Sequence, residues 1–457
     1  SSGRHILGHL ENGKIKLEEI YRFENGMDHK DGKLLWNVDR LFGEIVAGMR
    51  KCKELGKIPV SMAIDTWAVD YVLLDEQDRI LGDTYGYRDH RTDGMDAEVA
   101  KILPETELYA KTGIQKQIFN TVYQLMAVKQ KEPELLQRAK TLLMLPDYFG
   151  LRLTGNKLSE YTNGSTTQLV NPTTFQWDTD LIRKLGYPED IFLPLQMPGT
   201  KVGQLLPKMQ KEVGFDLEVV LCGSHDTASA VMAVPQTSGD GIYISSGTWS
   251  LMGIESLKPI INGNAAAANF TNEGGYDRRF RFLKNIMGLW MIQSVRHEYN
   301  DAYSFAQLCD MAEESKDFPS RVDVNDPSFL SPDSMVEVIK QYCQKTGQQV
   351  PESVGELASV VYCSLAQSYG ETVSGLEKIA GRIYDSIHII GGGSNAAYLN
   401  QLTADATGKT VYAGPGEATA IGNLLAQMIH AEELADLKNA RKCVRESFEI
   451  KKFVPEK

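Results

Sequence analysis

Cysteine, long apolar runs and a basic excess are all scarce in this sequence of 457 residues. Its six cysteines are scattered and form no Cys-x-x-Cys pair, which argues against a disulfide framework or a zinc site and favours reduced thiols. No apolar stretch approaches the ~18 residues that a membrane-spanning helix needs, and the first residues do not resemble a signal peptide. We therefore expect a cytoplasmic, water-soluble protein with no membrane partner.

The charge balance limits the possible partners further. The chain has 48 basic and 60 acidic residues, a formal net charge of −12, which argues against nucleic-acid binding and against an anionic membrane surface. A polyphosphate ligand would therefore need help from backbone N–H groups, a metal ion and a few polar side chains. The length is too great for one ordinary core, and a prior of ~150 residues per domain predicts two or three domains.

The stretch Glu218–Met232 carries the strongest local signal for chemistry. Its apolar run, Val219–Cys222, predicts a short buried strand, which a Gly-Ser turn and the small residues of a packed helix follow. This pattern places Asp226 near a helix N-terminus, where exposed N–H groups and the helix dipole favour a carboxylate. An ionised, rigidly held aspartate is what a phosphoryl-transfer enzyme needs to accept a proton from a sugar hydroxyl.

Two other interpretations of Asp226 compete with this one. Taken alone, the segment fits an N-cap aspartate without a catalytic role about equally well. The adjacent Ser224, His225 and Asp226 also suggest a serine hydrolase, but three consecutive residues cannot easily form the spatial relay of a catalytic triad.

Local patterns predict several elements of the first half. Asn12-Gly13 lies between two short alternating runs, which is a strong hairpin signal. Residues 39–56 have the apolar stripe of an amphipathic helix. Further elements are predicted along the chain: strands at Val60–Ile64 and Tyr71–Leu74, and helical segments over about 97–153 that Pro146-Asp147-Tyr148 interrupts.

A weak repeat relates the two halves of the chain. Ser245–Glu255 aligns with Ser1–Glu11 at five of eleven positions, including the shared Ser-Ser-Gly and the closing glutamate. Each half would then open with a strand, a polar turn and a second strand. This arrangement suggests an actin-like ATPase, whose phosphates lie between two such hairpins.

The C-terminal part predicts two successive strand–turn–helix units with glycines in the turns. Such glycines allow a ligand close to backbone N–H groups. A P-loop is excluded because the first glycine before Gly408-Lys409-Thr410 would fall at Thr403 inside a helix, and no third glycine of a dinucleotide fingerprint follows Gly414. The predicted elements are Asp385–Ile390, Gly391-Gly392-Gly393, Ser394–Gly408, Thr410–Ala413, Gly414-Pro415-Gly416 and Ala418–His430.

These residues together resemble the FGGY carbohydrate kinase family, over nearly the whole chain. The motifs that carry the resemblance are IDTWAVD, YRDHRTDGM, PDYFGLRLTG, SEYTNGSTTQLVN, SHDTASAV, SSGTWSLMG, NEGG, LKNIMGLWMIQ, GGGSN and GPGEATAIGN. The resemblance implies an α/β fold of two actin-like (ribonuclease H-like) domains, each a mixed five-stranded sheet flanked by helices, with a cleft between them. Domain 1–232 would hold the sugar, the first phosphate hairpin and the catalytic aspartate, and domain 233–457 would bind the nucleotide.

The resemblance also implies an activity and its site residues. The family members that this chain resembles most phosphorylate L-rhamnulose on its 1-hydroxyl with ATP and Mg²⁺, giving L-rhamnulose 1-phosphate and ADP in L-rhamnose catabolism. Asp226 would be the catalytic base. The sugar would contact Ala68, His225, Asp226, Thr227 and Asn285, and ATP would contact Ser1, Ser2, Gly3, Arg4, Thr248, Gln293 and Gly392.

The sequence departs from the family pattern at one position of the expected sugar site. The family pattern at residues 66–70 is T-W-G-V-D, and Ala68 stands here in place of the glycine. Asn285 and Gln293 are eight residues apart, about two helical turns, so one helix would let both face one cleft. The family places a strand ending in Asp-Leu-Gly before the first hairpin, so we expect such a strand, with an acid for the Mg²⁺–phosphate site, before Ser1.

Alternative functions stay open at this point. The nearest is an FGGY kinase for another ketose or polyol, such as L-fuculose or xylulose. A non-catalytic actin-like nucleotide-binding module is the second, although nucleotide binding alone needs no acid-bearing turn such as Ser224–Thr227. We expect the sugar and ATP as small-molecule partners, and a monomer or a homodimer.

Overall fold

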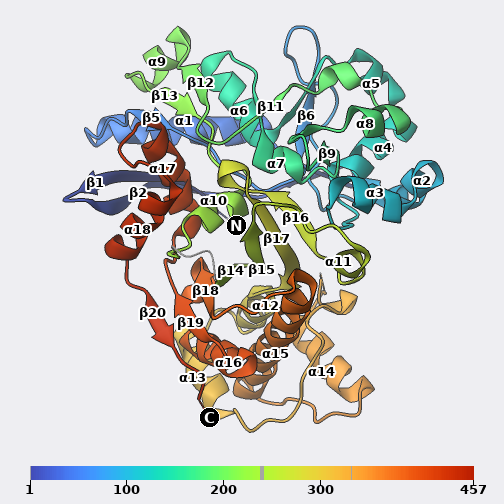
Figure 1. Cartoon of the computed structure of the whole chain (residues 1–457), viewed down its shortest axis with the longest axis vertical. Coiled ribbons are helices and arrows are strands. Elements are labelled where there is room, and N and C mark those ends of the chain that lie inside the picture. The colour runs from blue at the N-terminus through green and yellow to red at the C-terminus, as the bar shows by residue number, and fades with distance from the viewer. Residues whose placement is uncertain (1, 237–240, 331, 457) are drawn as a thin grey trace. The chain divides into compact units, whose positions relative to one another are not determined.

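The computed structural model describes residues 2–236, 241–330 and 332–456, shown as a ribbon in Figure 1. Helices and strands alternate along the chain, so the α/β class predicted from the sequence is confirmed. In the described part of the chain, no helix combines the length and the apolar character that crossing a bilayer requires. The chain divides into two compact units: unit 1 comprises Ser1–Met232, Ser256–Phe282 and Thr419–Cys443, and unit 2 comprises Ala233–Glu255, Leu283–Ala418 and Val444–Lys457.

Most elements of the chain belong to unit 1. Its strands are β1 (Ser2–Glu11), β2 (Lys14–Glu24), β3 (Asp28–Lys30), β4 (Lys33–Leu35), β5 (Ser61–Met62), β6 (Tyr71–Leu74), β7 (Thr141–Met144), β8 (Ser159–Glu160), β9 (Val170–Asn171), β10 (Gln176–Trp177), β11 (Leu195–Gln196), β12 (Lys201–Gln204), β13 (Glu218–Val220) and β16 (Thr271–Gly274). Its helices are α1 (Val38–Glu54), α2 (Met95–Ile102), α3 (Glu105–Thr112), α4 (Thr121–Lys131), α5 (Pro133–Arg138), α6 (Leu145–Thr154), α7 (Tyr161–Ser165), α8 (Thr179–Lys184), α9 (Pro207–Val213), α10 (Asp226–Met232) and α11 (Gly263–Ala267).

The opening hairpin and the first long helix confirm their sequence predictions. β1 and β2 pair in antiparallel fashion, and the turn between them uses positive φ at Asn12 (53°) and Gly13 (75°), as a two-residue hairpin of the right twist requires. Helix α1 begins after Asn37, whose side chain caps the N–H of Arg40, and buries the predicted stripe that includes Ile45.

A small sheet in unit 1 positions the acid-bearing turn. Strand β13 pairs in parallel with β5 and in antiparallel fashion with β12, so a strand from each of two distant segments ends at the same edge. The sheet contributes to a core of buried apolar side chains from α1, α6 and β13, which includes Leu41, Phe149 and Val219. The three-stranded order β12-β13-β5 differs from the five-stranded sheet that we expected, because β1 and β2 pair only with each other in the described residues.

The segment 97–153 corrects one prediction. Helices α2 to α5 occupy its first part, but the buried strand β7 precedes α6. Pro146 lies in the first turn of α6, where its missing N–H would have no intrahelical partner, so this proline starts a helix and does not interrupt one.

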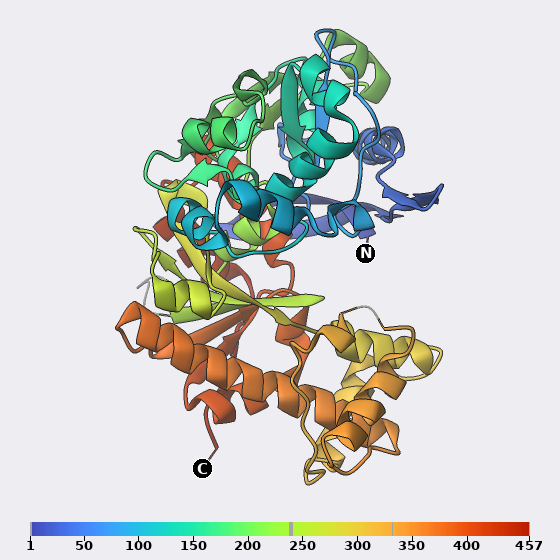
Figure 2. The same ribbon diagram turned by 90° about the vertical axis from the view of Figure 1, so that its right-hand side faces the viewer.

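Unit 2 contains a mixed sheet and helices packed beside it. Its strands β15, β14, β18, β19 and β20 follow one another in this order within a seven-stranded sheet. The long helix α15, orange in Figure 2, contacts α13 and α16. The elements here are β14 (Gly241–Ser246), β15 (Trp249–Ser256), β17 (Phe280–Met287), α12 (Trp290–Glu298), α13 (Phe305–Glu314), α14 (Met335–Lys345), α15 (Val354–Ala380), β18 (Ser386–Ile390), α16 (Ala397–Thr407), β19 (Thr410–Ala413), α17 (Ala418–His430), α18 (Leu437–Ser447) and β20 (Lys451–Phe453), of which β15, β17, α17 and α18 contribute residues to both units.

Candidate active site

The predicted strand–turn–helix around Asp226 is present in unit 1. Strand β13 leads into the turn, and α10 begins at Asp226 itself. The backbone N–H of Thr66 donates to the carbonyl of Ser224, and the N–H of Asp226 donates to the carbonyl of Thr66, both at 2.9 Å. This parallel pairing continues the direction of the β5–β13 ladder, so two segments far apart in sequence fix the backbone of Asp226.

The carboxylate of Asp226 is accessible on this fixed backbone. Its side chain is 49% exposed, whereas His225 and Thr227 are buried. Oδ1 accepts a hydrogen bond from the hydroxyl of Thr227 at 3.1 Å and lies 3.5 Å from Nε2 of His225. Within the described residues no hydrogen bond reaches Oδ2. The arrangement therefore leaves one carboxylate oxygen able to accept a proton from a bound ligand.

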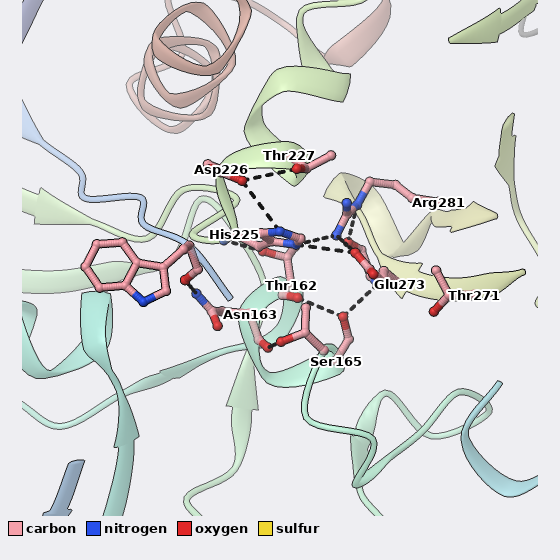
Figure 3. Close-up of polar contacts among 12 residues, drawn as sticks. Thr162, Asn163, Ser165, His225, Asp226, Thr227, Thr271, Glu273 and Arg281 are labelled. Atoms are coloured by element: carbon pink, nitrogen blue, oxygen red, sulfur yellow. Dashed lines mark hydrogen bonds and ion pairs between the residues drawn. The ribbon is translucent and has the colours of Figure 1, made fainter. Parts of the chain in front are cut away.

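A buried ion pair lies beside His225, as Figure 3 shows. Nη2 of Arg281 is 3.0 Å from Oε2 of Glu273 and 3.1 Å from Nδ1 of His225, and Nδ1 is 3.4 Å from the same Oε2. Arg281 is fully buried, and its Nε donates to the carbonyl of Gly274 at 2.8 Å. We call His225, Glu273 and Arg281 the Glu273 cluster.

The charges of the Glu273 cluster balance one another. Burial alone would raise the pKa of Glu273, but the guanidinium of Arg281 holds that pKa below its ordinary value. Glu273 is therefore an ionised carboxylate at neutral pH, and it is paired as a buried charge must be.

A second buried carboxylate, that of Glu160, also holds the turn, through the backbone and side chain of Ser224. Glu160 accepts hydrogen bonds from the backbone N–H groups of Thr162, Asn163 and Ser224, at 2.7, 2.9 and 3.2 Å. It also accepts from the hydroxyls of Thr162 and Ser224, at 2.7 and 2.6 Å. The N–H of Glu160 donates to Oδ2 of the buried Asp147 at 3.1 Å. We call these five residues the Glu160 cluster.

The Glu160 cluster contains no cation that offsets its two carboxyl groups. Burial raises the pKa of Glu160, and the donors around it oppose that shift only in part. Burial raises the pKa of Asp147 well above its ordinary value, and the negative charge of Glu160 adds to the effect. Because Glu160 accepts five hydrogen bonds and Asp147 accepts one, we expect Asp147 to be the more readily protonated of the two.

The backbone at Ala68 is held in a strained turn. Val69, the next residue, has φ of 65°, a conformation that β-branched residues rarely adopt. Its carbonyl accepts the hydroxyl hydrogen of Thr121 at 2.7 Å, and the N–H of Asp70 donates to the carbonyl of Ala68 at 2.8 Å. The buried carboxylate of Asp70 accepts the indole N–H groups of Trp36 and Trp67, at 2.6 and 2.9 Å, which secures the turn.

A further acid, Asp65, lies close to Asp226. Burial raises the pKa of Asp65 to about 7, against the effect of the hydrogen bond that it accepts from Asn423 at 2.7 Å. The negative charge of Asp226 contributes to this raised pKa, and the positive charge of Arg4 opposes it. The two carboxyl groups therefore repel each other, which is the situation that a bound cation relieves.

The predicted ATP residues of the first hairpin lie in a strand. Ser1 lies outside the described residues, whereas Ser2, Gly3 and Arg4 belong to β1. A Cβ on Gly3 would come within 2.0 Å of the ring of Phe23, so a larger residue would displace that ring. The aligned Ser245 and Ser246 end strand β14, and Gly247 and Thr248 form the turn, so the two copies of Ser-Ser-Gly differ in local structure.

Unit 2 gathers three predicted ATP residues around one end of the β14–β15 hairpin. The exposed Thr248 lies in the turn, and its carbonyl accepts the N–H of Trp290 at 3.1 Å, at the start of the helix that carries Gln293. Gly392 belongs to the glycine turn after β18, where a Cβ on the neighbouring Gly393 would lie 1.9 Å from Oγ of Ser246. Gly393 must therefore be a glycine, because a side chain at this position would collide with Ser246.

The position of Asn285 shows that the prediction of one helix carrying both Asn285 and Gln293 was wrong. Asn285 lies on strand β17, whereas Gln293 lies on α12, so the two residues do not share one helix. The interval of eight residues does not describe two helical turns, because Gly288 and Leu289 turn the chain between these elements. Oδ1 of Asn285 is buried and accepts no hydrogen bond from the described residues.

Sequence reasoning missed Glu273, Arg281, Glu160 and Asp65. All four lie in or beside motifs that carried the family resemblance, but no local pattern assigned them a role. Arg281 offered one usable signal, since it is a charged residue between the buried Phe280 and Phe282 of strand β17. A charged residue on the buried face of a strand requires a partner, so a buried carboxylate was to be expected nearby.

Comparisons with known proteins agree with this geometry. The chain is 53% identical over 454 residues to a protein named rhamnulokinase from Halalkalibacterium halodurans, with 99% of this chain and 97% of the relative covered. It is 46% identical over 458 residues to the rhamnulokinase of Bacillus subtilis, with 100% and 93% covered. Among solved structures, xylulose kinase from Lactobacillus acidophilus matches with a TM-score of 0.78 at 15% identity, covering 97% of this chain and 91% of that one. The predicted actin-like sugar kinase fold is confirmed by this likeness.

Two family patterns divide almost the whole sequence between them. Residues 1–233 match the FGGY family of carbohydrate kinases, N-terminal domain, and residues 242–431 match the C-terminal domain of the same family. With the acid-bearing turn, the fold and the full-length relatives in agreement, the chain is a sugar kinase that belongs to the FGGY family of carbohydrate kinases.

Proposed function

We propose that this chain phosphorylates L-rhamnulose on its 1-hydroxyl with ATP, giving L-rhamnulose 1-phosphate and ADP in L-rhamnose catabolism. The observation that carries the chemistry is the half-exposed carboxylate of Asp226 on a backbone fixed by Thr66. The choice of sugar is supported by relatives named rhamnulokinase that match over nearly their full length. L-fuculose and xylulose are less favoured substrates, since those relatives do not carry such names.

In this mechanism Asp226 is the general base. Its carboxylate accepts the proton of the 1-hydroxyl while the hydroxyl oxygen forms a bond to the γ-phosphorus of ATP. The bond between that phosphorus and the bridging oxygen breaks, and ADP leaves. The backbone of Asp226 is already held for this step by its hydrogen bonding to Thr66. Much of the rate enhancement therefore comes from positioning.

Four further residues are proposed to contact the sugar: His225, Thr227, Ala68 and Asn285. His225 and Thr227 flank Asp226 in the chain, and both lie against its Oδ1. The carbonyl of Ala68 already accepts the N–H of Asp70, so we propose the N–H of Ala68 as the sugar contact. The buried Oδ1 of Asn285 is suited to accept a hydrogen bond from a sugar hydroxyl, which would satisfy it.

For the nucleotide we propose Thr248, Gln293 and Gly392 in unit 2, and Ser1 to Arg4 in unit 1. The exposed hydroxyl of Thr248 and the glycine turn at Gly392 offer donors and close backbone approach to phosphate oxygens. Replacing Thr248 with leucine should raise the KM for ATP about tenfold and leave the KM for the sugar nearly unchanged. Steady-state kinetics with each substrate varied in turn will check this, and an equal rise of both KM values would remove Thr248 from the nucleotide site.

We also propose Mg²⁺ as the divalent cation of the reaction. Asp65 fits it, because Mg²⁺ is bound through one or two carboxylate oxygens together with phosphates and waters. The raised pKa of Asp65 beside Asp226 marks a place where positive charge is favourable. When bound, the cation supplies positive charge to the ATP phosphates. The use of ATP and the lack of a disulfide among the six cysteines are consistent with a cytoplasmic enzyme.

The decisive experiment replaces Asp226 with asparagine. Asparagine can still begin a helix, so the fold and ATP binding should remain, while sugar-dependent ADP release should fall ~10²–10⁴-fold. The matched control is Asp190→Asn, at an exposed aspartate far from the turn in sequence, which should change neither quantity. Near-normal turnover by Asp226→Asn would show that this residue is structural. A panel of ketoses assayed with the wild-type enzyme tests the sugar, and a rate with L-fuculose or xylulose above that with L-rhamnulose would overturn our choice.

A further inference from the structure

The surroundings of His225 restrict which of its ring nitrogens carries hydrogen. Nη2 of Arg281 is 3.1 Å from Nδ1, within hydrogen-bonding distance, and a guanidinium can only donate. Nη2 also lies 3.0 Å from Oε2 of Glu273 as an ion pair, but that oxygen receives no hydrogen bond from the described residues. Because Nε of Arg281 donates to Gly274, the whole guanidinium is fixed in orientation. Nδ1 of His225 is therefore an acceptor.

An accepting Nδ1 determines the other nitrogen. A neutral imidazole has one donor and one acceptor nitrogen, so its hydrogen then lies on Nε2. Nε2 faces Oδ1 of Asp226 at 3.5 Å, which suits a donor opposite a carboxylate. The opposite tautomer would place an N–H of His225 against an N–H of Arg281, and a nitrogen lone pair against the Asp226 carboxylate. Both contacts would be repulsive, and they outweigh the one contact that this tautomer would gain, an Nδ1–H directed at Oε2 of Glu273, because that distance is the longer one, at 3.4 Å.

This tautomer makes the two oxygens of Asp226 unequal. Oδ1 receives the hydroxyl hydrogen of Thr227 at 3.1 Å and faces the Nε2–H of His225. Oδ2 receives no hydrogen bond from the described residues. Donors at Oδ1 stabilise the ionised carboxylate and fix its plane, so the lone pairs of Oδ2 have a defined direction.

We propose that Arg281 and Glu273 are positioning residues that hold His225 as its Nε2–H tautomer, and that Oδ2 of Asp226 is the atom that takes the sugar proton. Glu273 contributes by balancing the charge of the buried Arg281, which keeps the guanidinium in place. In the step itself the sugar O–H bond breaks, its hydrogen passes to Oδ2, and the oxygen bonds to phosphorus as ADP departs. The catalytic part rests on the proposed function, whereas the tautomer is a property of the protein without substrate.

The tautomer is measured by long-range ¹H–¹⁵N correlation spectra of the full chain labelled at its eight histidines. The signals of His225 are those that the variant His225→Gln lacks. We expect an acceptor-type shift for Nδ1 and an N–H-type shift for Nε2 in the wild-type protein. In Arg281→Lys the fixed donor is lost, so Nδ1–H pointing at Glu273 should gain population. A wild-type spectrum of the Nδ1–H tautomer would overturn the proposal.

Kinetics connect the tautomer to catalysis. Arg281→Lys should lower kcat about 10-fold to 100-fold with little change in the KM for ATP, because the loss is a charge-assisted hydrogen bond at the base. His225→Gln can place an amide N–H near the position of Nε2, so it should retain more activity than His225→Leu, which has no donor. If Arg281→Lys does not fold, as circular dichroism will show, the ordering of the two His225 variants decides instead. Equal activity of the two variants would overturn the role of the donor. If Asp226→Asn stays active, the proposed base fails while the tautomer assignment stands.

Discussion

The Glu273 cluster and the Glu160 cluster hold the same turn by different means. Glu273 lies beside a fully buried arginine and a histidine, so its charge is matched by a cation. Glu160 accepts only from neutral N–H and O–H groups. Ser165 connects the two, because its hydroxyl donates to the carbonyl of Thr162 and accepts the N–H of Gly274 (Figure 3).

The pKa directions show what this difference means. Glu273 has a lowered pKa and Glu160 a raised one, although both side chains are buried. A cation offsets the cost of burying a carboxylate, whereas neutral donors orient it but do not remove that cost. The Glu160 cluster thus fixes the backbone of the turn, and the Glu273 cluster fixes the orientation of the ring that His225 presents to Asp226.

The largest effect on stability should come from removing the cation. Arg281→Met leaves the charge of Glu273 buried without a partner, and the free energy of unfolding should fall by ~3–5 kcal/mol, measured by urea denaturation. The control is Arg50→Met, which breaks the exposed ion pair with Glu212 and should cost less than ~1 kcal/mol. The double variant Arg281→Met/Glu273→Leu should recover most of the loss. A loss as small as that of the control would mean that the ion pair does not hold the turn.

A smaller loss should follow from changing the neutral-donor cluster. In Glu160→Gln an amide N–H₂ group must face the N–H and O–H donors of the turn, which leaves buried donors unsatisfied and costs about 3 kcal/mol. The matched control is Glu356→Gln, because Glu356 also accepts backbone N–H groups, of Glu352 and Ser353, but near solvent. We expect less than ~1 kcal/mol there, since water replaces the lost acceptor. Equal losses for both variants would contradict the importance of burial at Glu160.

The smallest effect is a difference in pH dependence. The raised pKa of Asp147 means that its contribution to stability is full below its ordinary pKa and is lost as pH rises through the folded value. The lowered pKa of Glu273 means the reverse, since its contribution is present above its ordinary pKa and is lost as pH falls. Asp147→Asn should therefore gain stability relative to the wild type as pH rises, and Glu273→Gln should lose it.

Urea denaturation of both variants and the wild type, from about pH 2 to about pH 9, gives the two slopes. Slopes of the same sign would show that the two clusters do not differ in charge as we infer. A flat result for Asp147→Asn alone would contradict the raised pKa of Asp147.

The sequence by itself determined the local parts of this site. An apolar run, a turn and small residues were enough to place Asp226 at the start of a helix, and the same reasoning predicted strand β19 and the full extent of α17. These features depend on propensities of neighbouring residues, which the chain carries wherever it folds. The roles of the individual site residues remain predictions, and Asp226→Asn is their most direct test.

Only the tertiary structure decided which side chains meet at the turn. Glu160, Asp65 and Arg281 come from segments far apart in sequence, and strand pairing and helix packing bring them to Ser224–Thr227. Local reasoning also misjudged Pro146, because a proline fits the first turn of a helix as well as a break between two. A buried charge is recognisable in a sequence, but its partner is chosen by contacts between distant segments, and no local pattern encodes these.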